Sequence, residues 1–284
     1  MGQTPCHDSL PEVHVKVLFI GDIVGAPGRD TVHQLLPGLV RSEGIEFVIA
    51  NGENAAGGKG LTPAVARELF AMGIHVLTNG NHVWHNKEII DILGRDERVL
   101  RPANYPQGVG VPGRGSGIYT ASNGVKIGVL NLVGRIFMPP YDCPFRIGRQ
   151  EVERLRLETP IIFIDFHAEA TSEKIALGWY FDGQVSAVIG THTHVATADE
   201  RVSEQGTALQ TDAGMTGPFD SVIGVRKEPV IEAMIKLMPA KHVPATGDLR
   251  MCGLLVDVDT ATGRATSANR ISLKARESVR SDNE

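Results

Sequence analysis

Five short apolar runs in this chain each end directly in a cluster of polar residues, and this feature constrains the fold more than any other. The junctions are VKVLFI before Gly21-Asp22, FVIA before Asn51-Gly52-Glu53-Asn54, IHVL before Thr78-Asn79-Gly80-Asn81-His82, IIFI before Asp165-Phe166-His167, and SAVI before Gly190-Thr191-His192-Thr193-His194. Apolar runs of this length, bounded by glycine and polar residues, are typical of buried strands. Open α/β sheets place their ligand sites beyond the carboxyl ends of such strands. The sequence therefore predicts an α/β fold with a functional site at this edge.

The polar clusters supply more metal-type donors than one ion usually takes. Carboxylate, amide and imidazole groups are all present, and glycines beside them let the backbone turn tightly. Two ions that share the Glu53 carboxylate would use the whole set. The predicted metal ligands are Asp22, Glu53, Asn54, Asn81, His167, His192 and His194. Mixed nitrogen and oxygen donors suit two divalent or trivalent transition-metal ions, either iron or manganese, with zinc as the alternative.

Strand alternation adds two expectations about this site. If the backbone is extended there, His192 and His194 point the same way and serve either two adjacent ions or one. Asp165 is expected on the strand face opposite His167, which makes His167 the better ligand. Asp212 follows a later apolar run, and it is either an acceptor that orients one of the two later histidines or an ordinary turn aspartate.

The order of these clusters resembles the calcineurin-like metallophosphoesterase superfamily. Its usual pattern is D-x-H, G-D, G-N-H, a single His and G-H-x-H. Here Val24 stands where the first motif has its histidine, and Glu53 stands where the second has aspartate. Both departures are shared with the bacterial 2′,3′-cyclic-nucleotide 2′-phosphodiesterase branch. The stretches that resemble this branch are GDIVGAPGR, IANGENAAGGKGLT, GNHVW, RPANYP, DFHAEATSEK, GTHTHVATADE and TDAGMTGP, which together span roughly residues 15 to 225.

This resemblance implies both a fold and a reaction. The implied fold is an αββα sandwich of two mixed sheets, with the metal site at the carboxyl ends of the strands. The implied activity is that of a phosphoric ester hydrolase, which opens 2′,3′-cyclic nucleotides and other phosphodiesters with a metal-bridged hydroxide. The departing 2′ oxygen would take its proton from His82, which follows the ligand Asn81 but lies outside the ligand set.

Two other interpretations of the same residues are kept. A mononuclear hydrolase of the amidohydrolase type also uses His-x-His, but there the pair is expected at the first strand, whereas here it comes late. A regulatory nucleotide- or RNA-binding protein with little turnover would retain the site without using it. The intact set of ligand residues favours the enzyme.

Two loops are candidates for substrate contacts. The glycine-rich loop that contains Lys59 precedes a helix start at Thr62-Pro63, and it either cradles a phosphate or forms a simple turn. The stretch from 134 to 149 has little periodicity, and it either lines the active cleft or packs on the surface. The predicted substrate contacts are Lys59, Arg135, Phe137 and Met138.

Local signals predict several boundaries of helices and strands. Pro37 is expected to end or kink the first helix near Leu36. Asn123-Gly124 predicts a hairpin turn and with it a second sheet. A later helix is expected from Gln150 to about Leu157, and Trp179 is expected in the core.

The composition of the chain indicates which kinds of partner and which cellular compartment to expect. The chain has 284 residues, 42% of them hydrophobic and 21% charged, which are globular values. A net charge of -5 gives no general basic surface, so no stable nucleic-acid complex is expected. Three widely spaced cysteines fit a reducing cytoplasm, and no stretch approaches a membrane span. The expected partner is a cyclic nucleotide or another phosphodiester, and the sequence does not decide whether the protein forms a homo-oligomer.

We expect a single domain over 14–275, with disordered tails at 1–13 and 276–284.

Overall fold

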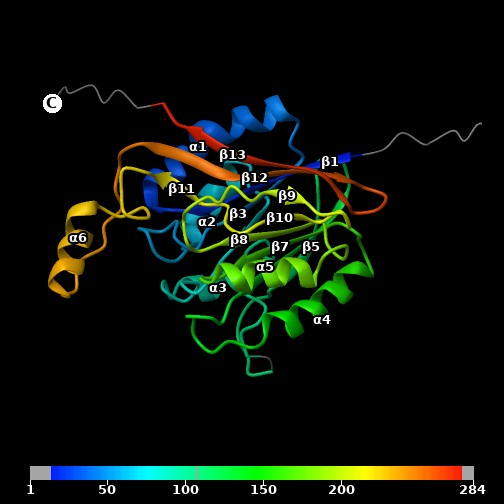
Figure 1. Ribbon diagram of the computed structural model, residues 1–284, viewed down its shortest axis with the longest axis horizontal. Helices are drawn as coiled ribbons and strands as arrows, with labels where there is room; N and C mark the ends of the chain where they lie inside the picture. Colours follow the sequence, from blue (N-terminus) through cyan, green and yellow to red (C-terminus); the bar gives the residue numbers. More distant parts are fainter. Residues whose placement is uncertain (1–13, 107, 277–284) are drawn as a thin grey trace, which may run out of the picture.

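The computed structural model describes residues 14–106 and 108–276, which form four layers (Figure 1). Two β-sheets face each other, and helices cover the outer side of each sheet. The αββα sandwich of two mixed sheets is therefore confirmed. Of the two predicted tails, 1–13 and 276–284, only residue 276 lies within the described part.

The first sheet contains seven strands. They are β1 (His14–Ile20), β2 (Asp22–Ile23), β3 (Phe47–Asn51), β4 (Val76–Thr78), β11 (Met215–Pro218), β12 (Leu249–Asp259) and β13 (Ala265–Lys274). β1, β3 and β4 are parallel neighbours, whereas β12 runs antiparallel to β1, β11 and β13. The first three polar clusters of the sequence therefore lie at one edge of this sheet.

The second sheet contains six strands. They are β5 (Ser116–Thr120), β6 (Lys126–Val133), β7 (Ile162–His167), β8 (Ala187–Thr191), β9 (Arg201–Val202) and β10 (Ala208–Gln210). β6, β7, β8 and β10 are parallel, and β5 and β9 are antiparallel strands at the two margins. The β5–β6 pair confirms the hairpin predicted at Asn123-Gly124.

The described chain has six helices, and five of them complete the layers. They are α1 (Gly25–Glu43), α2 (Pro63–Ala71), α3 (Ile89–Leu93), α4 (Pro144–Arg156), α5 (Thr171–Tyr180) and α6 (Lys227–Lys236). α1, α2 and α3 contribute to the core on the outer side of the first sheet, and α4 and α5 to the core on the outer side of the second. Thr62 caps α2 as predicted, because its side chain accepts from the Val65 N–H. α6 stands apart from both layers (Figure 1).

Central strands of the sandwich are buried on both faces. In β1, Val15, Val17 and Phe19 pack between the two sheets, while Leu18 and Ile20 pack against the helices of the first sheet. This two-sided burial explains why the strands appear in the sequence as continuous apolar runs and not as alternating ones.

Two local predictions are wrong, and so is one alternative of a third. α1 does not end near Leu36 but continues through Pro37, because Pro37 lies on the exposed side, where a carbonyl group that loses its helical hydrogen bond can be hydrated. The alternative of a kink at Pro37 stays a prediction. α4 begins at Pro144, well before Gln150, because proline is favoured in a first helical turn, where its missing N–H is not needed. Trp179 is 57% exposed, and the Arg201 guanidinium lies over its ring.

All helices and strands named above fall between His14 and Lys274. A single domain over 14–275 stays a prediction. Within 14–106 and 108–276, no helix has both the length and the apolar character that crossing a bilayer would require.

Candidate metal centre

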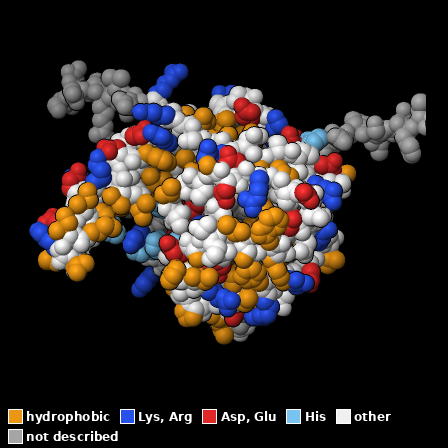
Figure 2. Space-filling view, in the orientation of Figure 1, with side chains coloured by type: hydrophobic (Ala, Val, Ile, Leu, Met, Phe, Trp, Pro, Cys, Tyr) orange, Lys and Arg blue, Asp and Glu red, His pale blue; other side chains and the backbone are white. Residues whose placement is uncertain are grey.

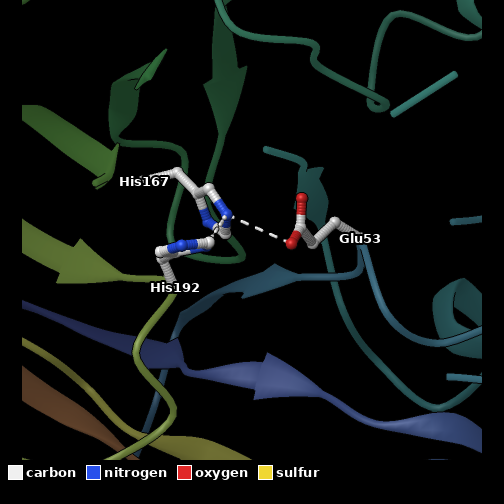
Figure 3. Close-up of side chains that lie close together, drawn as sticks. All are labelled: Glu53, His167 and His192. Carbon is white, nitrogen blue, oxygen red and sulfur yellow. Dashed lines mark hydrogen bonds and ion pairs between the residues drawn. The ribbon is translucent and has the colours of Figure 1, made fainter. Parts of the chain in front are cut away.

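The carboxyl ends of both sheets meet at one buried cluster of donor atoms (Figure 3). Glu53 follows β3, His167 ends β7 and His192 follows β8. The Nε2 atom of His167 lies 3.1 Å from Glu53 Oε1, 3.0 Å from His192 Nδ1 and 3.0 Å from Asn81 Oδ1. These four predicted ligands form the first donor group.

The other three predicted ligands form a second donor group beside the first. His194 Nε2 lies 3.7 Å from Asp22 Oδ1 and 3.2 Å from Asn54 Nδ2. Asn54 Nδ2 also lies 3.3 Å from Glu53 Oε1, so Glu53 borders both groups. Asn54 turns its amide nitrogen toward His194 and its amide oxygen toward His82 Nδ1, so in this orientation the oxygen does not face the second donor group.

The backbone at His192 and His194 is not extended, so the condition under which the two side chains would point the same way is not met. β8 ends at Thr191, and the φ angles of His192 and His194 are 100° and 67°. Such left-handed conformations are uncommon for residues other than glycine, and strand alternation does not apply to them. As a result, His192 joins the first donor group and His194 joins the second.

A hydrogen-bonded relay fixes the proton on the His167 ring. Burial raises the pKa of Asp165 to about 6, so this carboxyl is still ionised at pH 7 and can only accept. Thr191 Oγ1 donates to Asp165 Oδ1 at 2.7 Å and therefore accepts from His167 Nδ1 at 2.9 Å. The neutral ring then carries its proton on Nδ1, and its Nε2 lone pair faces the first donor group.

Asp165 does not lie on the strand face opposite His167. Side chains two residues apart along a strand point the same way, and both residues contact Thr191 Oγ1. Asp165 Oδ2 also accepts from Asn51 Nδ2 at 2.9 Å and from Thr78 Oγ1 at 2.5 Å. Because Asn51 and Thr78 belong to the first sheet, this buried carboxylate joins the two sheets behind the donors.

Two further acceptors orient the other histidines. The Glu169 carboxylate lies 3.0 Å from His192 Nε2, which leaves the Nδ1 atom of that ring unprotonated. The Ile223 carbonyl accepts from His194 Nδ1 at 2.9 Å, which leaves Nε2 facing the second donor group. Neither acceptor was predicted. The sequence holds a weak indication of the role of Glu169, because this residue comes two positions after His167. Nothing in the sequence indicates that the Ile223 carbonyl accepts from His194.

These proton positions direct two lone pairs at each other. His167 Nε2 and His192 Nδ1 are 3.0 Å apart, and two lone pairs repel at this distance unless a proton or a metal ion lies between them. Burial lowers the pKa of His167, but the carboxylates of Glu53, Asp22 and Asp165 together more than offset burial, and the pKa rises to about 9. Burial and the charge on His167 lower the pKa of His192 to about 3. In the metal-free protein at pH 7, one proton therefore occupies a position suited to a cation.

Two observations indicate that the space fits metal ions. The buried Oδ1 atom of Asp22 has no hydrogen-bond partner among the described residues, although buried carboxylate oxygens are usually paired. Burial also raises the pKa of Asp22. A Cβ atom at Gly80 would lie 2.3 Å from His167 Nε2 and 2.4 Å from Glu53 Oε2, so glycine keeps this space open. Carboxylates and imidazoles are the donors that transition-metal ions take in proteins, and the cluster is therefore a candidate metal-binding group.

His82 borders both donor groups. Its backbone N–H donates to Glu53 Oε2 at 3.1 Å, and its ring Nδ1 lies 3.0 Å from Asn54 Oδ1. Its side chain is 29% exposed and lines a cavity of about 800 Å³ that opens beside the donors. His82, the residue predicted to donate a proton, therefore contacts the predicted metal ligands and also faces the open cavity.

Only one of the four predicted substrate contacts lies in this cavity. Lys59 lines it together with donors of both groups. Arg135 and Met138 line a separate cavity of about 640 Å³ against α5, and Phe137 is 88% exposed. The loop from 134 to 149 therefore does not line the space beside the donors.

Asp212 holds the backbone between the two later histidines and neither of their rings. Its Oδ2 atom accepts from the Thr193 N–H at 3.1 Å and from the Thr193 hydroxyl at 2.7 Å, and it pairs with Lys174 Nζ at 2.7 Å. Asp212 and Lys174 are both buried, so breaking this pair would leave an uncompensated charge. Of the two alternatives for Asp212, the contact with a ring is wrong, because Glu169 and Ile223 take that role. Asp212 Oδ1 accepts from the Gly214 N–H at 2.8 Å, as an aspartate in a turn does.

Comparisons with known proteins agree with this geometry. A family model described as YmdB-like protein matches residues 18–271. The 2′,3′-cyclic-nucleotide 2′-phosphodiesterase of Bacillus subtilis is 47% identical over 257 residues, which cover 90% of this chain and 96% of that protein. A crystal structure of a hypothetical protein from Thermus thermophilus matches with a TM-score of 0.84 and 38% identity, over 92% of this chain and 100% of that one. A crystal structure of a novel phosphatase from Mycoplasma pneumoniae matches with a TM-score of 0.86 and 31% identity, over 93% of this chain and 95% of that one.

Metal binding is predicted to release a proton from His167. Because its pKa is about 9, this ring is protonated at pH 7 and must lose the Nε2 proton to bind a metal ion. Calorimetric titration with Mn²⁺ in two buffers of different ionisation enthalpy should show release of about one proton per chain at pH 7. The release should fall as the pH rises through about 9. His33→Ala removes an exposed histidine of α1 and should release the same amount. No release at pH 7 would contradict the assigned proton.

Asp212→Asn is predicted to weaken metal binding without removing a ligand. The loss of its charge opposite Lys174 frees Thr193 and the loop between His192 and His194, and metal affinity should fall by roughly 10- to 100-fold. The affinity is measured by calorimetry, with circular dichroism to verify folding.

Two further variants complete this test. Thr193→Val removes only the hydroxyl contact, leaves the buried ion pair intact, and should give a smaller loss in the same direction. Asp220→Asn removes an exposed aspartate that pairs with Lys227, and it should change nothing. Unchanged metal affinity in both folded Asp212→Asn and Thr193→Val would show that the loop keeps its conformation without Asp212.

Proposed function

Because the chain belongs to the YmdB-like protein family, we propose that it is a metal-dependent phosphodiesterase that opens 2′,3′-cyclic nucleotides at the 2′ oxygen and leaves a 3′-phosphate. The protein is an enzyme of the phosphoric ester hydrolase class, as its named relatives are. The observation that carries the proposal is the 3.0 Å approach of His167 Nε2 and His192 Nδ1 beside Glu53, because a metal ion can take the place of the proton that His167 carries in the metal-free protein.

The two donor groups support a site for two metal ions. His167, His192 and Asn81 surround one position, Asp22 and His194 border the other, and Glu53 lies between them. A single ion would leave part of this buried charge uncompensated. We propose iron or manganese as the metal, with zinc as the alternative, because the donors mix nitrogen and oxygen.

The metal ions, when bound, would neutralise charge on the phosphodiester and supply an activated water for attack on phosphorus. The chain itself supplies binding and orientation. Lys59 adds a positive charge to the wall of the cavity that would receive an anionic substrate. Glu169 and Thr191 hold the rings of His192 and His167 in one orientation, which keeps the site organised before substrate arrives.

His82 is the proposed proton donor to the departing 2′ oxygen. Its Nδ1 atom lies 3.0 Å from Asn54 Oδ1 and 3.3 Å from Glu53 Oε1, and these two acceptors hold the ring with Nδ1 protonated. The Nε2 atom is then free to carry the proton that a nucleoside alkoxide needs in order to leave.

Removal of His82 should affect substrates according to their leaving groups. The wild-type protein loaded with metal should convert 2′,3′-cyclic AMP to 3′-AMP, and a chelator should stop the reaction. His82→Ala should keep its metal and lose on the order of 10²- to 10⁴-fold in turnover of the cyclic nucleotide. The same variant should lose much less on bis(nitrophenyl) phosphate, because nitrophenolate leaves without a proton.

Other outcomes of this experiment identify other roles. Equal losses on both substrates, with metal content unchanged, would mean that His82 stabilises phosphoryl oxygens. Loss of metal would make it a ligand. His85 lines the same cavity with its ring centroid 6.5 Å from that of His82, so His85→Ala is the matched comparison. Selective loss in His85→Ala would transfer the proton donation to His85. Binding of the cyclic nucleotide without turnover by the metal-loaded wild type would favour a regulatory protein.

A further inference from the structure

One face of α6 lines the same cavity as the metal donors. Val230, Ala233 and Met234 are spaced so that a helix presents them on one side, Leu237 directly follows the helix, and all four border the cavity. Glu53 and His192 border the same cavity of about 800 Å³. The cavity therefore has donors and charge in one part and apolar side chains in another.

Two of these apolar side chains are unusually exposed for a folded chain. Met234 is 69% exposed and Leu237 is 92% exposed, and Val230 is the one buried residue of α6. Figure 2 shows hydrophobic side chains gathered over this helix, which projects from the edge of the molecule. A contiguous exposed apolar surface beside a functional site usually marks a binding site.

Ile223 connects this apolar surface to the metal donors. Its φ of 45° is uncommon for a β-branched residue, and strained residues of this kind gather at functional sites. The Ile223 carbonyl holds His194 Nδ1, while its side chain is 52% exposed and lines the cavity. The position of one apolar side chain is thus fixed relative to one predicted metal ligand.

We infer that the apolar wall formed by Ile223, Val230, Met234 and Leu237 is a subsite for the nucleobase of the substrate. This inference rests on the proposed function, which puts the phosphodiester at the donors. Methionine and aliphatic side chains pack well against flat aromatic rings. A cavity of about 800 Å³ is also within the range of small-molecule sites and larger than a cyclic phosphate alone requires. The subsite would favour cyclic nucleotides over cyclic phosphodiesters that have no base.

A second copy of this chain is the rival occupant, and α6 offers a matched control against it. Ile235 is 76% exposed and follows Met234 directly, but it does not line the cavity. A base in the cavity contacts Met234 and leaves Ile235 free. A partner chain seated on the helix would also use Ile235.

The test compares Met234→Ala and Ile235→Ala on two substrates that share a five-membered cyclic phosphodiester. These are 2′,3′-cyclic AMP and glycerol 1,2-cyclic phosphate, which has no base. Met234→Ala should lower kcat/KM for 2′,3′-cyclic AMP by about tenfold, mainly through KM. The same variant should leave kcat/KM for the base-free substrate unchanged. Ile235→Ala should change neither. Equal losses on both substrates, or no loss on either, would overturn the inference. Equal effects of both variants with a change in oligomeric state, measured by light scattering, would make the wall an interface.

Binding of 3′-AMP separates this inference from the proposed reaction. The metal-loaded wild type should bind 3′-AMP more tightly than glycerol 3-phosphate by calorimetry, and Met234→Ala should remove most of the difference. If the protein does not hydrolyse 2′,3′-cyclic AMP but shows this selectivity, the proposed reaction is refuted and the proposed subsite stands. If it hydrolyses 2′,3′-cyclic AMP but binds both phosphates equally, the proposed subsite is refuted.

Discussion

The buried approach of His167 Nε2 to His192 Nδ1, 3.0 Å apart, is the interaction on which the rest of the site depends. Neighbouring groups force these lone pairs together, since Thr191 and Asp165 hold one ring and Glu169 holds the other. Glu53 adds a buried negative charge, and His167 lowers the pKa of this carboxyl well below its usual range against the effect of burial. Without positive charge this arrangement would be costly, because desolvated charges and lone pairs would face each other unpaired.

The packing of the two sheets brings the donor atoms of the site together. Glu53 comes from the first sheet and His167 and His192 from the second, so the core between the sheets must pack well for the donors to meet. Asp165 accepts hydrogen bonds from both sheets directly behind the donors. A proton on His167 can hold the metal-free site together at neutral pH, and metal ions would replace that proton.

The sequence identifies the strands and the donors because both depend on local patterns. Apolar runs that end in glycine and carboxylate mark the carboxyl ends of parallel strands, and the seven predicted ligands lie in two adjacent groups. The left-handed backbone at His192 and His194 could not be predicted, because it depends on Asp212 and Lys174, which are distant in sequence from each other. The place of Asp165 was open to prediction, since residues two apart share a strand face. The apolar wall depends on where α6 lies relative to β3, and helix periodicity carries no such information.

Anomalous X-ray diffraction from crystals of the metal-loaded protein tests the facing lone pairs most directly. Two peaks are predicted. One should lie about 2.0–2.3 Å from His167 Nε2 and His192 Nδ1, and the other at the same range from Asp22 Oδ1 and His194 Nε2. Glu53 should contact both. A single peak, or coordination through His167 Nδ1 or His192 Nε2, would contradict the proton positions that Thr191 and Glu169 impose.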